Sequence, residues 1–139
     1  MSWKPHQKSM SLGQLAQHVA TVPAEVAGIL ATDTFDLKQL DNFEQPAATS
    51  RAQLLKDFEG AMKSAKDALN SYDDAKAMSV WSGVRDGKVI LSMPRAGFVR
   101  AIMLNHWYHH RGQLSVYLRL LNVPVPSIYG PSADENPFG

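Results

Sequence analysis

Hydrophobic residues recur every three or four positions in three long stretches of the chain. The first stretch covers about residues 11–30, the second runs from residue 49 or 50 to about 71, and the third covers about 98–121. This is the period of an α-helix with one apolar face, so the pattern predicts three long helices. The residues expected to face inward are Leu15, His18, Val22, Val26 and Ile29 in the first helix, Leu54, Leu55, Phe58, Met62, Ala65 and Leu69 in the second, and Val99, Met103, Trp107, Leu114, Tyr117, Leu118 and Leu121 in the third.

Local signals place the ends and interruptions of these helices. Pro23 lies inside the first helix and has no N–H to donate, so we expect a kink or a brief break, with a new helix start at this residue. Ser50 and Gln53 have the spacing of a capping box, which favours a start of the second helix at residue 49 or 50. The run Asn122-Val-Pro-Val-Pro ends the third helix.

The segments between the predicted helices follow other patterns. Residues 32–48 are polar and have no sustained period, which indicates a connecting loop with room for one helical turn. In residues 79–93 two short apolar runs flank Asp86-Gly87, which suits a tight turn, so we expect a short hairpin or extended crossover before the last long helix. Residues 127–139 contain too many turn residues for regular structure. The predicted fold is an all-α helical bundle that forms a single domain over residues 1–139.

Composition narrows the classes of function. The 14 Lys and Arg residues nearly balance the 13 Asp and Glu residues, so the chain offers no broad basic surface for nucleic acid. Cysteine is absent, which excludes disulfides, a Cys nucleophile and Cys-ligated metal centres, and any metal must be bound by His and carboxylates. The chain has neither an apolar leader nor a run of the roughly 18 apolar residues that a bilayer span needs. We therefore expect a cytoplasmic protein without nucleic-acid or membrane partners.

Three of the five histidines lie in the segment Asn105-His-Trp-Tyr-His-His-Arg-Gly-Gln-Leu of the third predicted helix. His106 and His110 are one turn apart, which puts both imidazoles on one helix face at the spacing of two ligands of one metal ion. That face is apolar, so both rings should point toward the core. Neighbouring buried imidazoles repel each other when charged and leave lone pairs without partners when neutral. A bound metal resolves both problems, and a pair of hydrogen-bonded core histidines is the alternative.

A third histidine, His18, lies on the apolar face of the first predicted helix. A single histidine in such a place is most often a core residue bonded to a carbonyl or carboxylate. If the first and last helices face each other, however, His18 completes a three-histidine site with open coordination positions, which is the catalytic pattern. His109 projects about 100° away from His110, as a surface residue or a neighbour of the site. Glu25, two turns after His18, is either a solvated helix residue or an acid–base group near the site.

Other common catalytic motifs are absent. A zinc-protease helix needs His-Glu-x-x-His, but Trp107, Tyr108 and His109 stand between the two histidines, so no Glu follows the first one. The chain has no Gly-x-Ser-x-Gly elbow of a serine hydrolase and no glycine-rich nucleotide-binding loop. The histidines are therefore the only candidate centre that the sequence supplies.

The chain resembles the DinB-like superfamily of metal-dependent four-helix proteins, which are bacterial for the most part. The resemblance is carried by the segments from Trp3 to His18, from Pro94 to Phe98 and from Asn105 to Leu121, followed by Val123-Pro-Val-Pro; the run His-His-Arg-Gly-Gln is its most specific part. It implies an up-down helical bundle and one divalent metal ion, bound by a histidine of an early helix and two of a His-x-x-x-His helix. The matching positions are His18, His106 and His110. Zinc or nickel is the leading expectation for the ion, with iron or manganese next.

Members of this family carry another long helix before the segment that begins here with Trp3. We therefore expect the first family helix to be missing from this chain or supplied by a partner chain, since three helices alone would expose an apolar stripe. This predicts a homodimer.

Two hypotheses about function follow from the resemblance and the histidines. Some relatives transfer low-molecular-weight thiols or isomerise thiol conjugates, so the first hypothesis is a metal-dependent enzyme of thiol-transferase or hydrolase type. Its substrate would be a small molecule, a thiol being one candidate. The second is a non-catalytic metal-binding or stress-response bundle that acts as an interaction module. The sequence separates them poorly, because both need the same helical core.

Overall fold

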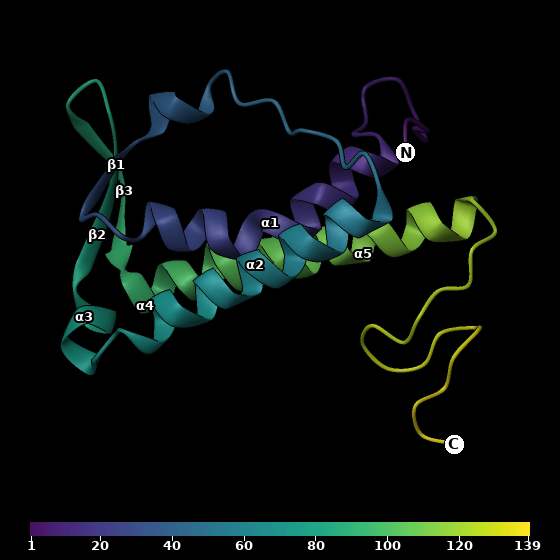
Figure 1. Cartoon of the computed structure of the whole chain (residues 1–139). Coiled ribbons are helices and arrows are strands. Elements are labelled where there is room, and N and C mark those ends of the chain that lie inside the picture. The colour runs from purple at the N-terminus through teal and green to yellow at the C-terminus, as the bar shows by residue number, and fades with distance from the viewer.

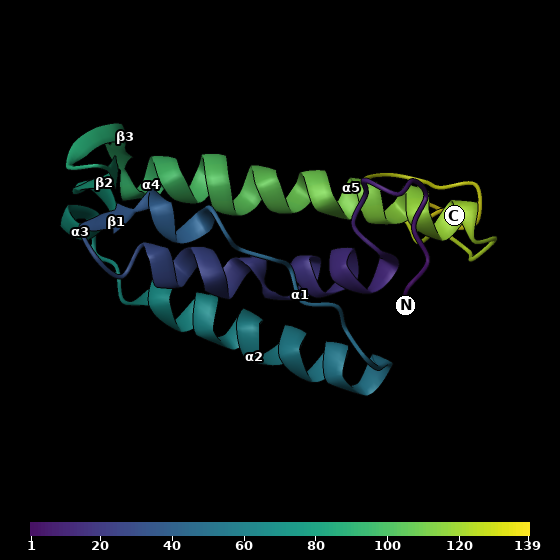
Figure 2. The same ribbon diagram turned by 90° about the horizontal axis from the view of Figure 1, so that it is seen from above.

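Three long helices dominate the computed structural model, which describes residues 1–139. They are α1 (Leu12–Ile29), α2 (Arg51–Asn70) and α5 (Asn105–Leu120), as the apolar periods predict. α1 lies in the middle and packs against α2 on one side and α5 on the other (Figures 1 and 2). A small sheet closes one end of the helices, and both chain termini lie toward the other end (Figure 1). No helix combines the length and hydropathy that a membrane span requires.

α1 continues through Pro23 as one helix, so the predicted new helix start at this residue is wrong. Pro23 has no N–H to donate to the carbonyl of Val19, four residues earlier. That carbonyl instead accepts the indole N–H of Trp107 from α5, at 2.8 Å. A side chain of the facing helix thus replaces the missing hydrogen bond, and it ties α1 to α5 beside the histidine segment.

Serine side chains cap the beginnings of α1 and α2. Ser11 and Gln14 form a reciprocal capping box at the start of α1, with N···O distances of 3.2 and 2.9 Å. At α2 the Ser50 hydroxyl accepts the Gln53 N–H at 3.1 Å, as predicted, whereas the Gln53 side chain accepts from the N–H of Thr49 rather than from Ser50. Each helix therefore begins one residue after a serine, because the hydroxyl satisfies a backbone donor that has no partner within the helix.

The last helical region is longer and less regular than predicted. It begins with α4 (Arg95–Phe98), continues through the π-helical segment η2 (Val99–Leu104) and ends with α5. Pro94 is its N-cap residue, so the helix starts three residues before the expected Phe98. A π-helical turn has more residues than an α-turn and rotates everything that follows it. Since η2 ends just before α5, it sets the direction in which the histidines of α5 project.

A three-stranded sheet corrects the prediction of an all-α fold. Its strands are β1 (Thr34–Asp36), β2 (Val80–Arg85) and β3 (Lys88–Pro94), in the order β1-β2-β3. β2 and β3 form the predicted hairpin, and its turn residues Asp86 and Gly87 have φ values of 51° and 73°. β1 pairs in parallel with β2 and falls in the segment that the sequence predicts to be a loop. Three residues are too few to show the two-residue period of a strand.

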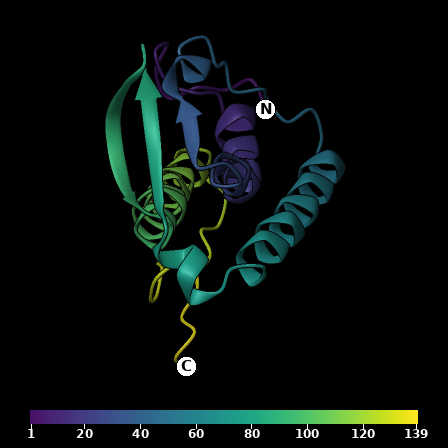
Figure 3. The ribbon, with the colours of Figure 1, turned by 90° about the vertical axis from the view of Figure 1, so that its left-hand side faces the viewer.

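Two shorter helical elements complete the chain. The 3₁₀ helix η1 (Leu37–Leu40) follows β1 and is the single helical turn expected in this segment. α3 (Asp74–Met78) connects α2 to β2. Seen from the sheet end, α1 lies between α2 and α5 while the strands pass across this end (Figure 3).

The main hydrophobic core lies where the helices meet the sheet. Trp81 of β2 is only 1% exposed, its ring centroid lies 4.2 Å from that of Phe98, and its indole N–H donates to the carbonyl of Ile29 at 3.2 Å. The other fully buried members of this core are Val26, Ala27, Leu30, Ala65 and Met103. This core fixes the end of α1 and the beginning of the last helical region against the sheet.

The side chain of Arg95, the first residue of α4, is fully buried against the C-terminal end of α1. Its guanidinium donates to the carbonyls of Leu30 and Thr32 at 3.3 and 3.0 Å and to the carboxylate of Asp33 at 2.5 Å. A cation is favourable there because the last carbonyls of a helix lack partners within the helix and carry the negative end of its dipole. Arg95 thereby ties the start of the last helical region to the end of α1 and aligns α1 with α5.

α2 contributes less to the core than its apolar pattern predicts. Ala61 and Ala65 are buried, whereas Leu55 and Phe58 are 46% and 38% exposed. Leu54, Met62 and Leu69 are half-buried. The prediction that Leu55 and Phe58 face inward is therefore wrong. The reason is that α2 packs mainly against α1, so only a narrow stripe of α2 is covered.

Candidate metal centre

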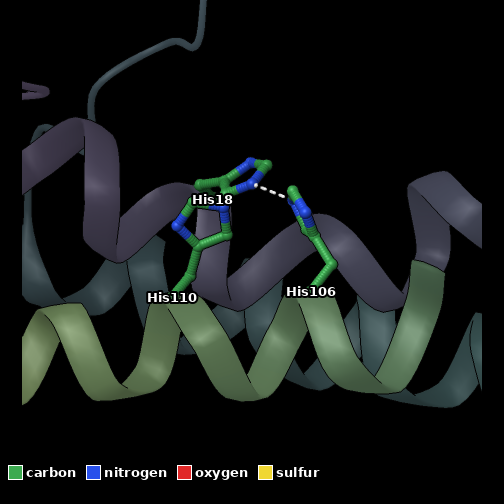
Figure 4. Close-up of side chains that lie close together, drawn as sticks. All are labelled: His18, His106 and His110. Carbon is green, nitrogen blue, oxygen red and sulfur yellow. Dashed lines mark hydrogen bonds between the residues drawn. The ribbon is translucent and has the colours of Figure 1, made fainter. Parts of the chain in front are cut away.

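The three histidines singled out in the sequence lie together between α1 and α5. His18 projects from the middle of α1, and His106 and His110 project toward it from successive turns of α5 (Figure 4). The Nε2 atoms of His18 and His106 are 3.0 Å apart. The ring centroids are separated by 5.2 Å for His18 and His106, 4.5 Å for His18 and His110, and 4.4 Å for His106 and His110. The expected pairing of the first and last helices therefore brings the histidines into one cluster.

Two glutamine side chains determine which imidazole nitrogens are available in this cluster. Nδ1 of His18 lies 2.8 Å from Oε1 of Gln45, and Nδ1 of His110 lies 2.7 Å from Oε1 of Gln113. An amide oxygen only accepts hydrogen bonds, so each Nδ1 carries the proton and donates it. The Nε2 of both rings is then unprotonated, as a metal ligand requires, and without a metal ion the Nε2 of His18 accepts a hydrogen bond from Nε2 of His106 at 3.0 Å.

Neither Gln45 nor Gln113 is predicted from the sequence to belong to the site, and the reasons differ. Gln45 is 8% exposed in the connection between η1 and α2, a segment without a periodic pattern, and only folding brings it to His18. Its backbone carbonyl accepts the side-chain amide N–H of Gln14 at 3.1 Å, which anchors the segment on α1. Gln113 follows His110 by three residues on the same helix. That spacing is a signal by which it could have been found.

The surroundings of the cluster lower the pKa of two of its imidazoles, those of His106 and His110. Burial is the main cause that lowers the pKa of His106, the charge of His18 lowers it further, and the Glu25 carboxylate opposes the shift. For His110, burial lowers the pKa to about 4, although the hydrogen bond to Gln113 acts in the opposite direction. A neutral imidazole repels no cation and offers a lone pair. Near neutral pH protons therefore compete little with a metal ion for these two rings.

The arrangement of the donor atoms is consistent with a site for a single metal ion. One nitrogen of each of the three rings lies within 4.8 Å of the nitrogens of the other two. Two imidazole nitrogens that bind one ion at about 2.0–2.1 Å each can be at most about 4.2 Å apart, and the 3.0 Å between His18 and His106 satisfies this limit. All three donors are imidazoles, a set that suits zinc, nickel, copper or iron better than magnesium or calcium. The cluster could therefore hold a transition-metal ion.

A pocket of about 610 Å³ opens beside two of the histidines. His18 and His106 lie in its wall, and seven of its twelve lining residues are hydrophobic. Glu25 is an exposed residue of α1 and also lines this pocket. A second, smaller pocket of about 170 Å³ is lined by His110, Gln113 and Tyr117 among others. The cluster is thus accessible from two sides.

His109 is not part of the cluster. It is exposed, and its ring meets that of His110 edge-on with centroids 4.9 Å apart. This agrees with the expected projection of His109 away from the face that carries the other two histidines. Its charge acts on the site from outside, as one of the smaller causes that lower the pKa of His106 and His110.

Comparison with known proteins agrees with this architecture. The model of the DinB family matches residues 2–137. The uncharacterized protein YrdA of Bacillus subtilis is 28% identical over 128 residues, which cover 92% of this chain and 71% of YrdA. A solved DinB-like protein of Bacillus cereus superimposes with a TM-score of 0.64 at 22% identity, covering 92% of this chain and 79% of that one. A solved DinB-like protein of Bacillus subtilis gives a TM-score of 0.64 at 18% identity, with 97% and 82% covered. The chain belongs to the DinB family.

Proposed function

We propose that the protein is a metal-dependent enzyme of the thiol-transferase or hydrolase type, whose single divalent ion is bound by His18, His106 and His110. The observation that carries this proposal is the convergence of three imidazoles of which two are oriented through Nδ1 by glutamines, beside a pocket large enough for a small molecule. A purely structural histidine cluster has no need of an adjoining pocket.

The residues of the site have different chemical roles. A bound ion supplies Lewis acidity, which lowers the pKa of a water molecule or a thiol to near neutrality. The three histidines leave coordination positions free for such a ligand, since catalytic ions with three protein ligands keep an open site. Gln45 and Gln113 keep the rings of His18 and His110 in place. Glu25 is exposed on the pocket wall and is the carboxylate available to take up or deliver a proton.

Metal analysis tests the ligand assignment. Protein purified without an affinity tag should contain about one equivalent of a divalent ion, with zinc or nickel expected first. His106→Ala should remove most of it. His109→Ala is the matched control, because His109 lies on the same helix but outside the cluster, and it should retain the ion. Less than about half an equivalent in the wild type, unchanged by His106→Ala, would overturn the assignment.

Turnover needs a separate test. Panels of thiol conjugates and esters should reveal an activity that a chelator abolishes and that added metal restores. If the protein binds about one equivalent of metal but turns over none of these compounds, the proposed reaction is wrong, and a non-catalytic metal-binding module that acts through interactions is the remaining hypothesis.

A further inference from the structure

We infer that the pocket beside His18 and His106 binds a small hydrophobic molecule that carries an amine, with the amine at Glu25, and that it discriminates against carboxylates of the same shape. This inference rests on the proposed function, because it assigns a substrate class to the same site. It follows from the shape of the pocket, the placement of its carboxylate and the absence of lysine and arginine from its wall.

One face of α1 forms the long wall of the pocket. His18, Val22, Glu25, Val26 and Ile29 all line it, and they follow one another at helical spacing along that face. Eleven residues separate the first from the last, which corresponds to roughly 16 Å along the helix axis. The pocket is therefore elongated, with the histidines at one end, and its volume of about 610 Å³ lies within the range of small-molecule sites.

The opposite wall comes from the segment after α1. Phe35 belongs to β1, Leu40 to η1, and Phe43 follows η1. Leu40 and Phe43 are 48% and 54% exposed although they face an apolar pocket. A hydrophobic ligand would remove part of this apolar surface from water, which is the main source of affinity in such a site.

Apart from a metal ion at the histidines, the charge in the pocket has one sign. Glu25 is the only acidic residue of the wall, and no lysine or arginine lines the pocket. None of the six ion pairs of the chain involves Glu25, so its carboxylate is free to meet a ligand. Glu25 follows His18 by about 10 Å along the axis, and helical side chains lean toward the N-terminus, here toward the histidines. An amine would gain an ion pair at this point, whereas a carboxylate would be repelled.

Lysine side chains line a different pocket of the molecule. Lys4 and Lys8 line a separate polar pocket of about 370 Å³, which contains Gln45 but none of the three histidines of the cluster. An anionic molecule therefore finds its cations outside the apolar pocket. That second pocket also contains Glu44, so the preference for an amine beside His18 and His106 rests on Glu25 and on the absence of lysine and arginine from the apolar pocket.

The probes are 4-phenylbutylamine and 4-phenylbutyrate, which share one hydrophobic body and differ in charge. Isothermal titration with the metal-free full-length chain measures binding to the pocket independently of the ion. We expect the amine to bind with a stoichiometry of one and at least about tenfold more tightly than the acid. Glu25→Gln should abolish this preference. Equal or tighter binding of the acid by the wild type would overturn the inference.

A pair of glycine variants shows whether the probe occupies this pocket. Gly28 lines the pocket on α1 and Gly60 lies on α2 away from it; in both helices an added Cβ meets no atom within 4 Å. Gly28→Phe should place a ring at the pocket and abolish amine binding, while Gly60→Phe should bind like the wild type. Circular dichroism confirms that both variants fold. Unchanged amine binding by folded Gly28→Phe would contradict the assignment of the pocket.

Metal content separates this inference from the proposed function. Glu25→Gln and Gly28→Phe should keep the metal content of the wild type, because neither residue belongs to the histidine cluster. If the chain binds no metal yet shows the expected amine preference, the proposed function fails and the amine pocket stands. If metal binds and the preference is absent, the substrate class is wrong while the metal centre stands.

Discussion

Gln45 and Gln113 decide, at the scale of single residues, how the histidine rings are held. Each accepts the Nδ1–H of one imidazole and leaves its Nε2 unprotonated, so we expect the two glutamines to raise metal affinity without touching the ion. Their placements differ, since Gln113 lies on the same helix as His110 while Gln45 comes from a connection between helices. A loss of metal affinity on substitution of Gln45 would therefore also show that this connection positions the site.

Removal of the Gln45 amide should weaken metal binding. We predict that Gln45→Ala lowers metal affinity by about 10–100-fold, because His18 loses the acceptor that fixes its ring and tautomer. Gln45→Glu should restore much of the affinity, since a carboxylate also accepts from Nδ1. Competition with a chromogenic chelator measures both. Gln39→Ala is the control, because Gln39 lines the pocket but makes no hydrogen bond to the cluster. Equal affinities of Gln45→Ala and the wild type would contradict a positioning role.

The lowered pKa values of His106 and His110 predict how stability depends on pH in the metal-free protein. The unfolded chain takes up protons on these histidines near pH 6.5, whereas the folded state resists protonation of His110 down to about pH 4. Between these values the unfolded state binds more protons, so the free energy of unfolding decreases as the pH falls from 6.5 toward 4. Urea unfolding at several pH values measures this slope. His110→Ala should flatten it, and an unchanged slope would contradict the prediction.

At the scale of elements, a hydrogen bond between two helices replaces one that a proline cannot make within its own helix. The carbonyl of Val19 loses its helical donor because Pro23 lies four residues later, and Trp107 of α5 donates in its place. The same contact holds α5 against α1 between His106 and His110. The carbonyl that the proline leaves without a helical donor is therefore part of the interface between α1 and α5.

A double-mutant cycle isolates this contact. Trp107→Phe keeps an aromatic ring but removes the donor, and it should lower the free energy of unfolding by about 1–3 kcal/mol, because the Val19 carbonyl is left without a partner. In a Pro23→Ala background the restored backbone N–H can donate to the Val19 carbonyl. Trp107→Phe should then lower the free energy of unfolding by a smaller amount. Urea unfolding of the four proteins gives the coupling energy. If Trp107→Phe lowers the free energy of unfolding equally in both backgrounds, the Trp107 hydrogen bond does not replace the one lost at Pro23.

At the scale of the whole molecule, apolar side chains remain uncovered on two helices. On α2, Leu55 and Phe58 are 46% and 38% exposed, and on α5 Val116 and Leu120 are 55% and 56% exposed. α2 and α5 lie on opposite sides of α1, so neither covers the other (Figure 3). Adjacent exposed apolar residues on a helix are typical of surfaces that bind a partner.

We predict that the protein is a homodimer in which the exposed face of α2 is buried. Light scattering coupled to size exclusion should give twice the mass of one chain at micromolar concentration. Leu55→Glu combined with Phe58→Glu should yield a monomer, because two carboxylates would be buried without partners. Lys63→Glu is a control for added negative charge, because Lys63 is an exposed residue of α2 that is not part of the Leu55 and Phe58 pair. A wild-type monomer at all concentrations would contradict the dimer.

Features that depend on neighbours along the chain could be predicted from the sequence. The periods of α1, α2 and α5, the serine cap at Ser50 and the turn at Asp86 and Gly87 arise from backbone geometry over a few residues. The pairing of His106 with His110 belongs to this class, because one helical turn separates them. The family could also be identified from the sequence, since its specific segment is the same short histidine run.

The tertiary structure alone decided what depends on contacts between distant segments. It placed Gln45 on His18, replaced the hydrogen bond lost at Pro23 by one from Trp107, and paired β1 with β2 in a sheet that the helical pattern did not indicate. Such contacts leave no period in the sequence, because each joins residues far apart in the chain whose meeting is settled by packing of the whole molecule. The histidine pair is therefore local in origin, whereas its third member, its orientation and its pocket are products of the fold.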